Sequence, residues 1–251
     1  MSYSFNIITL GCKVNQYESE AVEELFLQKG YQKKSTRADI YVINTCTVTN
    51  MSDRKSRQMI SRARRDNPDS VIAVMGCYSQ VKPEEVAGID GVDIVLGSRN
   101  KESVVELCED ILQNKSVSDK IIAPSETKSF EELQISNQTE MTRAYLKIQD
   151  GCNMYCSYCL IPYARGNIVS RDIKDIADES KRLAANGFKE IVLTGIHVSS
   201  FGKDLDEDIS LIDAIEEVSK VDGIERIRLS SMEPRHITRD FLERMKATGK
   251  A

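Results

Sequence analysis

The chain has 251 residues, with 34 basic and 39 acidic side chains, a net charge of −5 and 41% hydrophobic residues. This length allows one or two domains with their own cores, and the composition excludes wholesale disorder. The negative net charge excludes attraction to a polyanion by an overall positive field, so nucleic-acid binding would need a local basic patch. No apolar run reaches the roughly 18 residues of a membrane-spanning helix. The start, MSYSFNIITLGC, lacks the basic segment of a secretory signal, and we expect a cytoplasmic protein without membrane contact.

The first half of the chain alternates short apolar segments with helical patterns. Strands are predicted over residues 5–10, 40–44, 71–75 and 92–96. Helices are predicted over residues 17–29, 51–66 and 101–114. Alternation of this length is typical of βαβ units, so we predict an α/β fold with a doubly wound parallel sheet in residues 1–118.

The next segment has a different composition. Residues 116–140 are rich in Ser, Thr, Glu and Gln, contain Pro124 and show no sustained period. We interpret residues 119–140 as a linker between domains.

The alternation resumes in residues 141–251. Strands are predicted over 144–148, 190–194 and 224–229, and helices over 173–185, 209–219 and 239–246. A parallel sheet of these three strands would leave an exposed edge. We therefore expect either an unusually small second domain or a fragment of a longer protein.

Seven cysteines in a chain without signs of export indicate metal or redox chemistry rather than disulfides. Cys152, Cys156 and Cys159 form a Cys-x3-Cys-x2-Cys pattern directly after a predicted strand. Three thiolates suit a 4Fe–4S cluster whose fourth iron is open to a small molecule. The alternatives are a zinc site that borrows a distant ligand and a set of buried structural cysteines.

Three other cysteines each follow a predicted strand. Cys12 follows the first strand, Cys46 the second and Cys77 the third. Because parallel strands end at the same edge of their sheet, these residues are expected to meet and share a second cluster. The alternative is that each is a small buried hydrophobe. Cys108 lies in phase with the apolar face of a predicted helix and is assigned to the core.

Beyond this spacing, the segments GCKVNQYESE, NTCTVTNMSDRKSRQ and GCNMYCSYCLIPYARG resemble blocks of the radical S-adenosylmethionine (SAM) methylthiotransferases. The resemblance runs from residue 5 onward and includes the signature Cys-x3-Cys-x-aromatic-Cys, with Tyr158 as the aromatic residue. It implies a cluster-binding amino-terminal domain, a partial (βα) radical SAM barrel, two 4Fe–4S clusters and SAM as cofactors. GCKVNQYE and RLSSMEP look most like the branch that acts on N6-threonylcarbamoyladenosine in tRNA.

The resemblance also implies the reaction, which is methylthiolation at C2 of the adenosine just 3′ of the anticodon. SAM would bind the open iron of the cluster on Cys152, Cys156 and Cys159, and one electron would cleave it to a 5′-deoxyadenosyl radical. The second cluster would supply sulfur, and a further SAM the methyl group. The implied partners are tRNA and an electron donor of unknown identity.

Three further residues are assigned to SAM binding by the same resemblance. Tyr158 would lie against the adenine, and Thr194 and Gly195 would approach the methionine amino group. For Gly195 the alternative is an ordinary turn glycine. His197 and His236 follow predicted strands and are interpreted as surface residues.

One local basic feature stands out in residues 53–66, where six basic side chains accompany two acidic ones. The basic residues are Arg54, Lys55, Arg57, Arg62, Arg64 and Arg65. They either contact tRNA phosphates or form a solvated helix face.

The resemblance also implies further barrel strands and a small RNA-binding β-domain, and we expect neither of them within these 251 residues. The hypothesis of a tRNA methylthiotransferase therefore has two alternatives. One is a sibling enzyme that acts on isopentenyladenosine in tRNA or on a ribosomal protein. The other is a non-catalytic iron–sulfur or zinc protein, or an inactive fragment.

Overall fold

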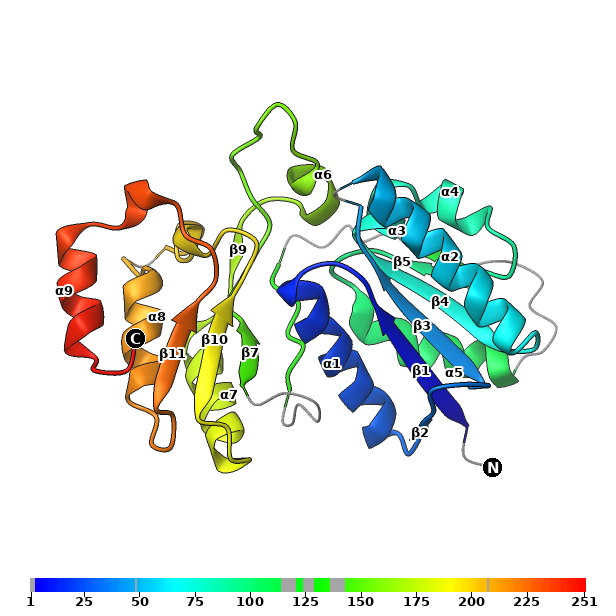
Figure 1. The fold of residues 1–251 in the computed structure, drawn as a ribbon, viewed down its shortest axis with the longest axis horizontal. Helices are drawn as coiled ribbons and strands as arrows, with labels where there is room; N and C mark the ends of the chain where they lie inside the picture. Colours follow the sequence, from blue (N-terminus) through cyan, green and yellow to red (C-terminus); the bar gives the residue numbers. More distant parts are fainter. Residues whose placement is uncertain (1–2, 48, 114–120, 124–128, 136–142, 207) are drawn as a thin grey trace. The chain divides into compact units, whose positions relative to one another are not determined.

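The computed structural model describes residues 3–47, 49–113, 121–123, 129–135, 143–206 and 208–251. The chain divides into two compact units (Figure 1). The first contains Met1–Thr127 together with Cys156–Arg165, and the second contains Lys128–Tyr155 and Gly166–Ala251. The first unit is therefore not continuous in sequence. It includes part of the loop that carries Cys152, Cys156 and Cys159, which we call the second cysteine-rich loop.

The first unit is built on a six-stranded sheet in the order β2-β1-β3-β4-β5-β6, with every neighbouring pair parallel. Its strands are β1 (Ser4–Thr9), β2 (Gln32–Lys33), β3 (Ile40–Thr45), β4 (Val71–Gly76), β5 (Ile94–Leu96) and β6 (Ile121–Ala123). The chain moves to one side of the sheet after β1 and to the other side after β3. This reversal between neighbouring strands is the point where open α/β sheets bind ligands.

Helices cover both faces of this sheet, as the doubly wound prediction requires (Figure 1). The helical elements of this unit are α1 (Lys13–Gln28), α2 (Asn50–Asp66), α3 (Cys77–Val81), α4 (Pro83–Ala87), the 3-10 turn η1 (Lys101–Ser103), α5 (Val104–Gln113) and α6 (Ile161–Arg165). Alternate residues of the central strands point to opposite faces. Ile40 and Val42 pack with α1 and α5, whereas Tyr41 and Ile43 pack with α2, α3 and α4.

The predicted boundary at residue 118 needs a correction. β6 lies inside the segment 119–140 that we interpreted as a linker, and it extends the first sheet. Its three residues are too short to show a hydrophobic period, so composition alone could not reveal the strand. Further along, Leu133 and Ile135 are buried in the second unit. The rest of the predicted linker lies outside the described residues.

The second unit contains a three-stranded parallel sheet in the order β11-β10-β7 and a small antiparallel pair, β8 with β9. The strands are β7 (Ala144–Lys147), β8 (Gln149–Asp150), β9 (Val169–Ser170), β10 (Glu190–Thr194) and β11 (Arg226–Leu229). The helices are α7 (Ile173–Ala185), α8 (Leu211–Ser219) and α9 (Arg239–Ala247), with 3-10 turns η2 (Val198–Ser200) and η3 (Pro234–His236). None of the helices in the described ranges combines the length and apolarity needed to cross a membrane.

Side-chain caps explain where several helices start. The Thr49 side chain accepts a hydrogen bond from the backbone of Ser52 at the start of α2, and Asp172 does the same for Lys174 in α7. Ser210 and Asp213 form a reciprocal capping box at the start of α8. These caps satisfy backbone donors that the first helical turn leaves open.

The turn from β4 into Cys77 depends on Gly76. Its φ is +103°, and a Cβ there would lie 2.6 Å from both Asn44 Oδ1 and the Thr45 carbonyl oxygen. We expect Gly76→Ala to lower the free energy of unfolding by about 2 to 6 kcal/mol, because positive-φ strain and overpacking each cost about 1 to 3 kcal/mol.

Gly30→Ala is the matched control for this prediction. Gly30 also has a positive φ of +82°, but a Cβ added there would meet no atom within 4 Å. It should cost only the backbone strain of about 1 to 2 kcal/mol. Urea unfolding followed by circular dichroism measures both variants, and equal losses would contradict the close approach at Gly76.

Candidate functional site

The three strand-end cysteines lie at the carboxyl edge of the first sheet. Cys12 is the N-cap residue of α1, Cys46 follows β3 directly, and Cys77 is the first residue of α3 after β4. Because β1, β3 and β4 are adjacent in the sheet, the predicted meeting of these residues at one edge is what the structure shows. Cys46 and Cys77 are buried, whereas Cys12 is exposed.

Contacts around these cysteines show that they share one environment. A Cβ at Gly11, next to Cys12, would lie 3.0 Å from the Cβ of Cys46. The Cys12 thiol donates to Asn15 Oδ1 at 3.2 Å, and the same oxygen accepts from Arg165 Nη2 at 3.1 Å. The Arg165 guanidinium in turn hydrogen-bonds the Cys77 side chain. Burial raises the pKa of the Cys77 thiol overall, and the nearby charge of Arg165 offsets only part of this rise.

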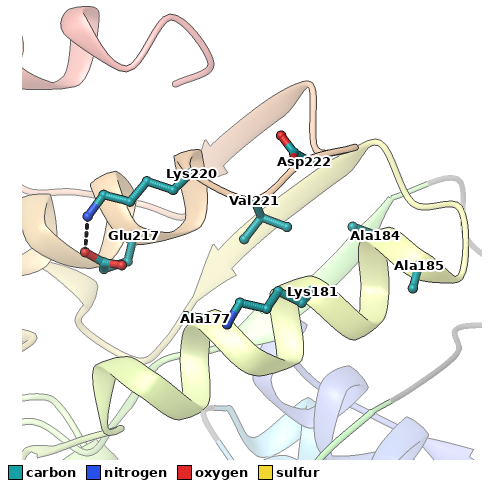
Figure 2. A pocket seen from close by; sticks show the side chains of 8 residues that line it. All are labelled: Ala177, Lys181, Ala184, Ala185, Glu217, Lys220, Val221 and Asp222. Carbon is teal, nitrogen blue, oxygen red and sulfur yellow. Dashed lines mark hydrogen bonds and ion pairs between the residues drawn. The ribbon is translucent and has the colours of Figure 1, made fainter.

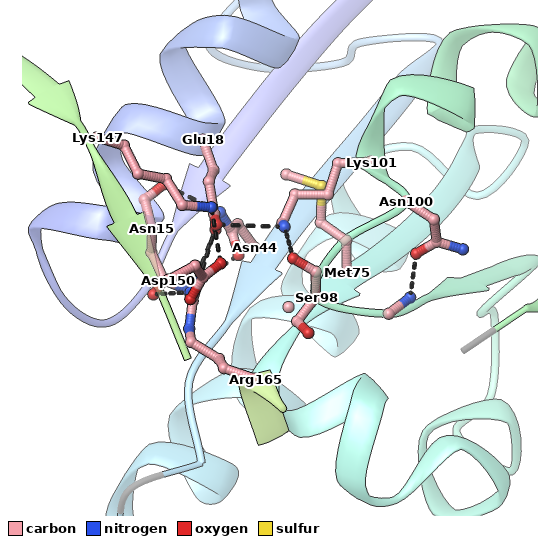
Figure 3. Close-up of polar contacts among 12 residues, drawn as sticks. Asn15, Glu18, Asn44, Met75, Ser98, Asn100, Lys101, Lys147, Asp150 and Arg165 are labelled. Atoms are coloured by element: carbon pink, nitrogen blue, oxygen red, sulfur yellow. Dashed lines mark hydrogen bonds and ion pairs between the residues drawn. The ribbon is translucent and has the colours of Figure 1, made fainter. Parts of the chain in front are cut away.

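Arg165 belongs to a buried group of charges in the first unit, shown in Figure 3. Its guanidinium donates to both carboxylate oxygens of Glu18, at 2.9 and 3.2 Å. Lys101 Nζ lies 3.3 Å from the same carboxylate and also donates to the Ser98 carbonyl oxygen. All three charged side chains are fully buried, and the bidentate geometry is the one in which a buried Arg–carboxylate pair is best satisfied.

Asn15 connects this charged group to the sheet. Its amide nitrogen donates to Asn44 Oδ1 and to the Thr45 carbonyl oxygen, each at 3.0 Å. Asn44 Nδ2 donates back to the Asn15 carbonyl oxygen at 3.0 Å. The start of α1 and the end of β3 are therefore held together beside Cys12 and Cys46.

The sequence analysis did not identify Glu18 or Arg165, although both lie in segments that resemble the methylthiotransferase family. A signal for Glu18 was present, because it shares the buried face of α1 with Val14, Ala21 and Val22. A charged residue at an apolar position of an amphipathic helix requires a buried partner. Nothing in the sequence identified that partner, which lies 147 positions away.

The second cysteine-rich loop begins in the second unit and continues in the first. Its base is closed within the second unit, where the Cys152 backbone donates to the Gly166 carbonyl oxygen at 3.1 Å. The Asn153 side chain also accepts from the Ile168 backbone at 3.0 Å. In the first unit, Cys159 donates through its backbone to the Cys156 carbonyl oxygen. Cys156 is exposed, and Cys152 and Cys159 are partly exposed.

Gln149 organises the start of this loop and was not singled out from the sequence. Its amide nitrogen donates to the carbonyl oxygens of Asp150 and Gly151, at 2.6 and 2.8 Å. Its amide oxygen accepts from the His197 backbone at 2.8 Å. One buried side chain thus connects the loop that leads to Cys152 with the loop after β10.

The residues assigned to SAM binding have different environments. Thr194 is buried at the end of β10, and Tyr158 is 91% exposed. At Gly195 a Cβ would lie 2.8 Å from Gln149 Oε1 and 2.9 Å from its carbonyl oxygen. The absence of a side chain at Gly195 therefore accommodates Gln149. The SAM contacts of Tyr158, Thr194 and Gly195 stay predictions.

The two histidines, interpreted from the sequence as surface residues, come together in the second unit. Their rings lie edge to face with centroids 5.8 Å apart, and both are near Glu233. Sequence reasoning placed each of them after a strand but had no reason to pair them. Cys108, in contrast, is fully buried in the core as predicted, and burial raises its thiol pKa.

A hollow of about 470 Å³ lies between the ends of α7 and α8 (Figure 2). Its lining includes Ala184 and Ala185 at the end of α7, and Val221 and Asp222 just after α8. These residues precede β10 and β11, so they lie at the amino-terminal edge of the sheet. In βα folds this edge supports stability, whereas the carboxyl edge carries chemistry.

Only some of the six basic side chains predicted to form a patch on helix α2 are free to face solvent. Arg64 donates to the carbonyl oxygens of Pro68, Ser70 and Gly91 and pairs with Asp93, so its role is structural. Arg57 pairs with Glu85. A surface hollow of about 490 Å³ is lined by Arg54, Arg57, Gln58, Met59, Ser61, Arg62 and Arg65.

Two families match this chain. Residues 4–97 match the Uncharacterized protein family UPF0004, and residues 146–251 match the Radical SAM superfamily. The fold is similar to that of the radical S-adenosylmethionine methyltransferase TsrM from Kitasatospora setae. The TM-score is 0.56 at 13% identity, over 100% of this chain and 66% of that chain. The chain is thus a radical SAM protein that carries a UPF0004 domain ahead of its radical SAM domain.

Curated relatives narrow this class. The threonylcarbamoyladenosine tRNA methylthiotransferase MtaB of Bacillus subtilis is 44% identical over 94% of this chain and 52% of its own length. The enzyme of the same name from Aquifex aeolicus is 41% identical over 94% of this chain and 57% of its own length. A tRNA-2-methylthio-N(6)-dimethylallyladenosine synthase from Natranaerobius thermophilus is 36% identical over 98% of this chain and 56% of its own length. The chain is thus similar to tRNA methylthiotransferases over almost all of its own length, and it spans about half the length of the curated relatives it matches.

The buried charges predict a stability effect. We expect Arg165→Met to lower the free energy of unfolding of the first unit by about 3 kcal/mol, because it leaves the Glu18 carboxylate buried with only part of its charge compensation. Differential scanning calorimetry should show a melting temperature lower by several degrees.

Arg239→Met is the control, since Arg239 is 92% exposed and, among the described residues, pairs only with Glu243 across one helical turn. It should leave the melting temperature nearly unchanged. If Arg165→Met is equally harmless, the buried network does not stabilise the unit.

Proposed function

We propose that this chain carries the cluster-binding and SAM-binding parts of an enzyme that methylthiolates C2 of N6-threonylcarbamoyladenosine, just 3′ of the anticodon in tRNA. The observation that carries the proposal is the meeting of Cys12, Cys46 and Cys77 at one sheet edge of a radical SAM methylthiotransferase chain. Because the substrate would be tRNA, we expect the reaction to take place in the cytoplasm. The electron that reduces the clusters would come from a donor of unknown identity.

The donor sets suit iron–sulfur clusters. Cys12, Cys46 and Cys77 would hold one 4Fe–4S cluster, and Cys152, Cys156 and Cys159 the other, each set leaving one iron open. Soft thiolate ligands in sets of three, without a histidine or carboxylate completing either pattern, favour iron–sulfur over zinc. When bound, these clusters and SAM supply the reducing electron, the sulfur and the methyl group.

The chain's own residues position these groups. Asn15 and Arg165 hold the Cys12 loop and the Cys77 side chain beside each other, and the fixed positive charge of Arg165 offsets the negative charge of the thiolates. Thr194, Gly195 and Tyr158 would contact SAM. The protein thereby supplies binding, orientation and electrostatics, and the cofactors supply the reactivity.

Cluster content gives the first test. After anaerobic reconstitution we expect about eight irons per chain, as two 4Fe–4S clusters require, and 5′-deoxyadenosine on reduction with SAM. Cys46→Ser should remove about half of the iron. The matched control is Cys108→Ser, because Cys108 is a core residue, and it should retain all of it. One zinc per chain without SAM cleavage would contradict the proposal.

The substrate has a separate test. Relatives named for threonylcarbamoyladenosine reach 44% and 41% identity, against 36% for one named for dimethylallyladenosine. The complete gene should restore the methylthio derivative of threonylcarbamoyladenosine in a strain that lacks this modification, as detected by mass spectrometry of tRNA nucleosides. A methylthiolated isopentenyladenosine product would instead assign the chain to the sibling branch.

The exposed face of α2 is the proposed contact for tRNA phosphates. We expect Arg62→Glu combined with Arg65→Glu to weaken binding of an anticodon stem-loop RNA and to reduce the magnitude of its salt slope by about 2, because each residue contacts about one phosphate. Filter binding at several salt concentrations measures both quantities.

The control reverses two other exposed charges, Lys181→Glu with Lys220→Glu, which flank the hollow in Figure 2. This variant has the same change in net charge. If both double variants weaken binding equally, the effect is one of net charge and α2 is only a solvated face.

A further inference from the structure

The chain contains two histidines, and the structure brings both to one place in the second unit. His197 follows β10, and His236 is the last residue of η3, which follows β11. Because β10 and β11 are parallel neighbours, the two loops lie at the same edge of the sheet. Neither histidine has a role in the function proposed above.

Glu233 completes the group. Its Oε1 lies 3.3 Å from His197 Nε2, and its Oε2 lies 3.9 Å from His236 Nε2. One ligand atom from each of the three residues lies within 4.8 Å of the other two. Ligands at about 2.0 to 2.2 Å from a single ion are about 3 to 4 Å apart, so small side-chain rotations would close the set around a metal.

The orientation of His197 favours coordination through Nε2. Its Nδ1 lies 2.5 Å from Ser200 Oγ, so the other ring nitrogen is directed at Glu233. Nε2 of His197 and Nε2 of His236 are buried without a hydrogen-bond partner within the part of the chain that the structure describes. A hydrogen bond to the far nitrogen of a histidine is the usual support for a metal ligand.

Arg235 is a neighbour of the Glu233 carboxylate, with its Nε 2.5 Å from Glu233 Oε2. The Arg235 side chain is 56% exposed, so it can turn to solvent when a cation takes its place.

We propose that His197, Glu233 and His236 form a binding site for a divalent transition-metal ion, with zinc as the representative ion. Two imidazoles and one carboxylate are the ligands of open zinc sites and of mononuclear iron(II) sites. Three protein ligands leave at least one position for water or an oxygen donor. The site uses none of the six cysteines and does not depend on the proposed tRNA chemistry.

The test uses the full chain with its clusters already reconstituted, so that the cysteines are occupied before zinc is added. After addition of Zn²⁺ and gel filtration, we expect one retained zinc per chain. Zinc K-edge X-ray absorption should show nitrogen and oxygen scatterers, including imidazole, and no sulfur. This readout does not require enzyme activity.

Substitutions then assign the ligands. His197→Ala, His236→Ala and Glu233→Gln should each weaken zinc binding by more than about 100-fold, and Ser200→Ala by about 10-fold as an outer partner. Glu243→Gln is the control, because it removes an exposed carboxylate elsewhere in the second unit, and it should leave binding unchanged. Glu233→Gln keeps the side-chain size, and circular dichroism verifies that each variant is folded.

Two results would overturn the site. One is zinc bound only through sulfur, which would place it on the cysteines. The other is zinc affinity that is the same in folded ligand variants and in the unsubstituted chain. Failure of this site would leave the cluster content and SAM cleavage of the proposed enzyme unaffected.

Discussion

Parallel pairing of β1, β3 and β4 is the constraint on which the candidate site depends. Each of these strands is followed by one cysteine, and the three residues are separated by a complete βα unit along the chain. Only a shared strand direction brings residues so distant in sequence to the same edge. In an antiparallel sheet, at least one of the three would lie at the opposite end. The chemistry assigned to Cys12, Cys46 and Cys77 is therefore a consequence of sheet topology rather than of a local motif.

The second constraint is charge burial. The buried carboxylate of Glu18 pairs with Lys101 and with Arg165. Arg165 comes after the loop that carries Cys152, Cys156 and Cys159. A buried carboxylate with two cationic partners is costly to form, and its geometry is correspondingly specific. Because Arg165 contacts both Glu18 and the Cys77 side chain, the same guanidinium positions α6 and adjusts the electrostatics of the cysteine edge.

Much of this arrangement was predictable from the sequence, for identifiable reasons. The 13-residue helix α7 was located to the residue, and the strand-end positions of the cysteines followed from the βα alternation. Short elements such as β6 and α6 were missed, since three to five residues carry no measurable period. The pairing of Glu18 with Arg165 and the meeting of His197 with His236 could not be predicted, because each requires knowing which loops the folded sheet brings together. Arg64 shows the opposite error, in which a residue that resembles an RNA contact is used to hold backbone carbonyls.

The discontinuity of the first unit has a consequence for biosynthesis. Glu18 emerges from the ribosome 147 residues before its partner Arg165, so the nascent sheet must wait through most of the translation of this chain before its carboxylate is neutralised. In that interval Lys101 can already contact the Glu18 carboxylate. The amino-terminal sheet is therefore expected to mature late during synthesis, together with the loop that bears Cys156 and Cys159, which couples the completion of both thiol sets in time.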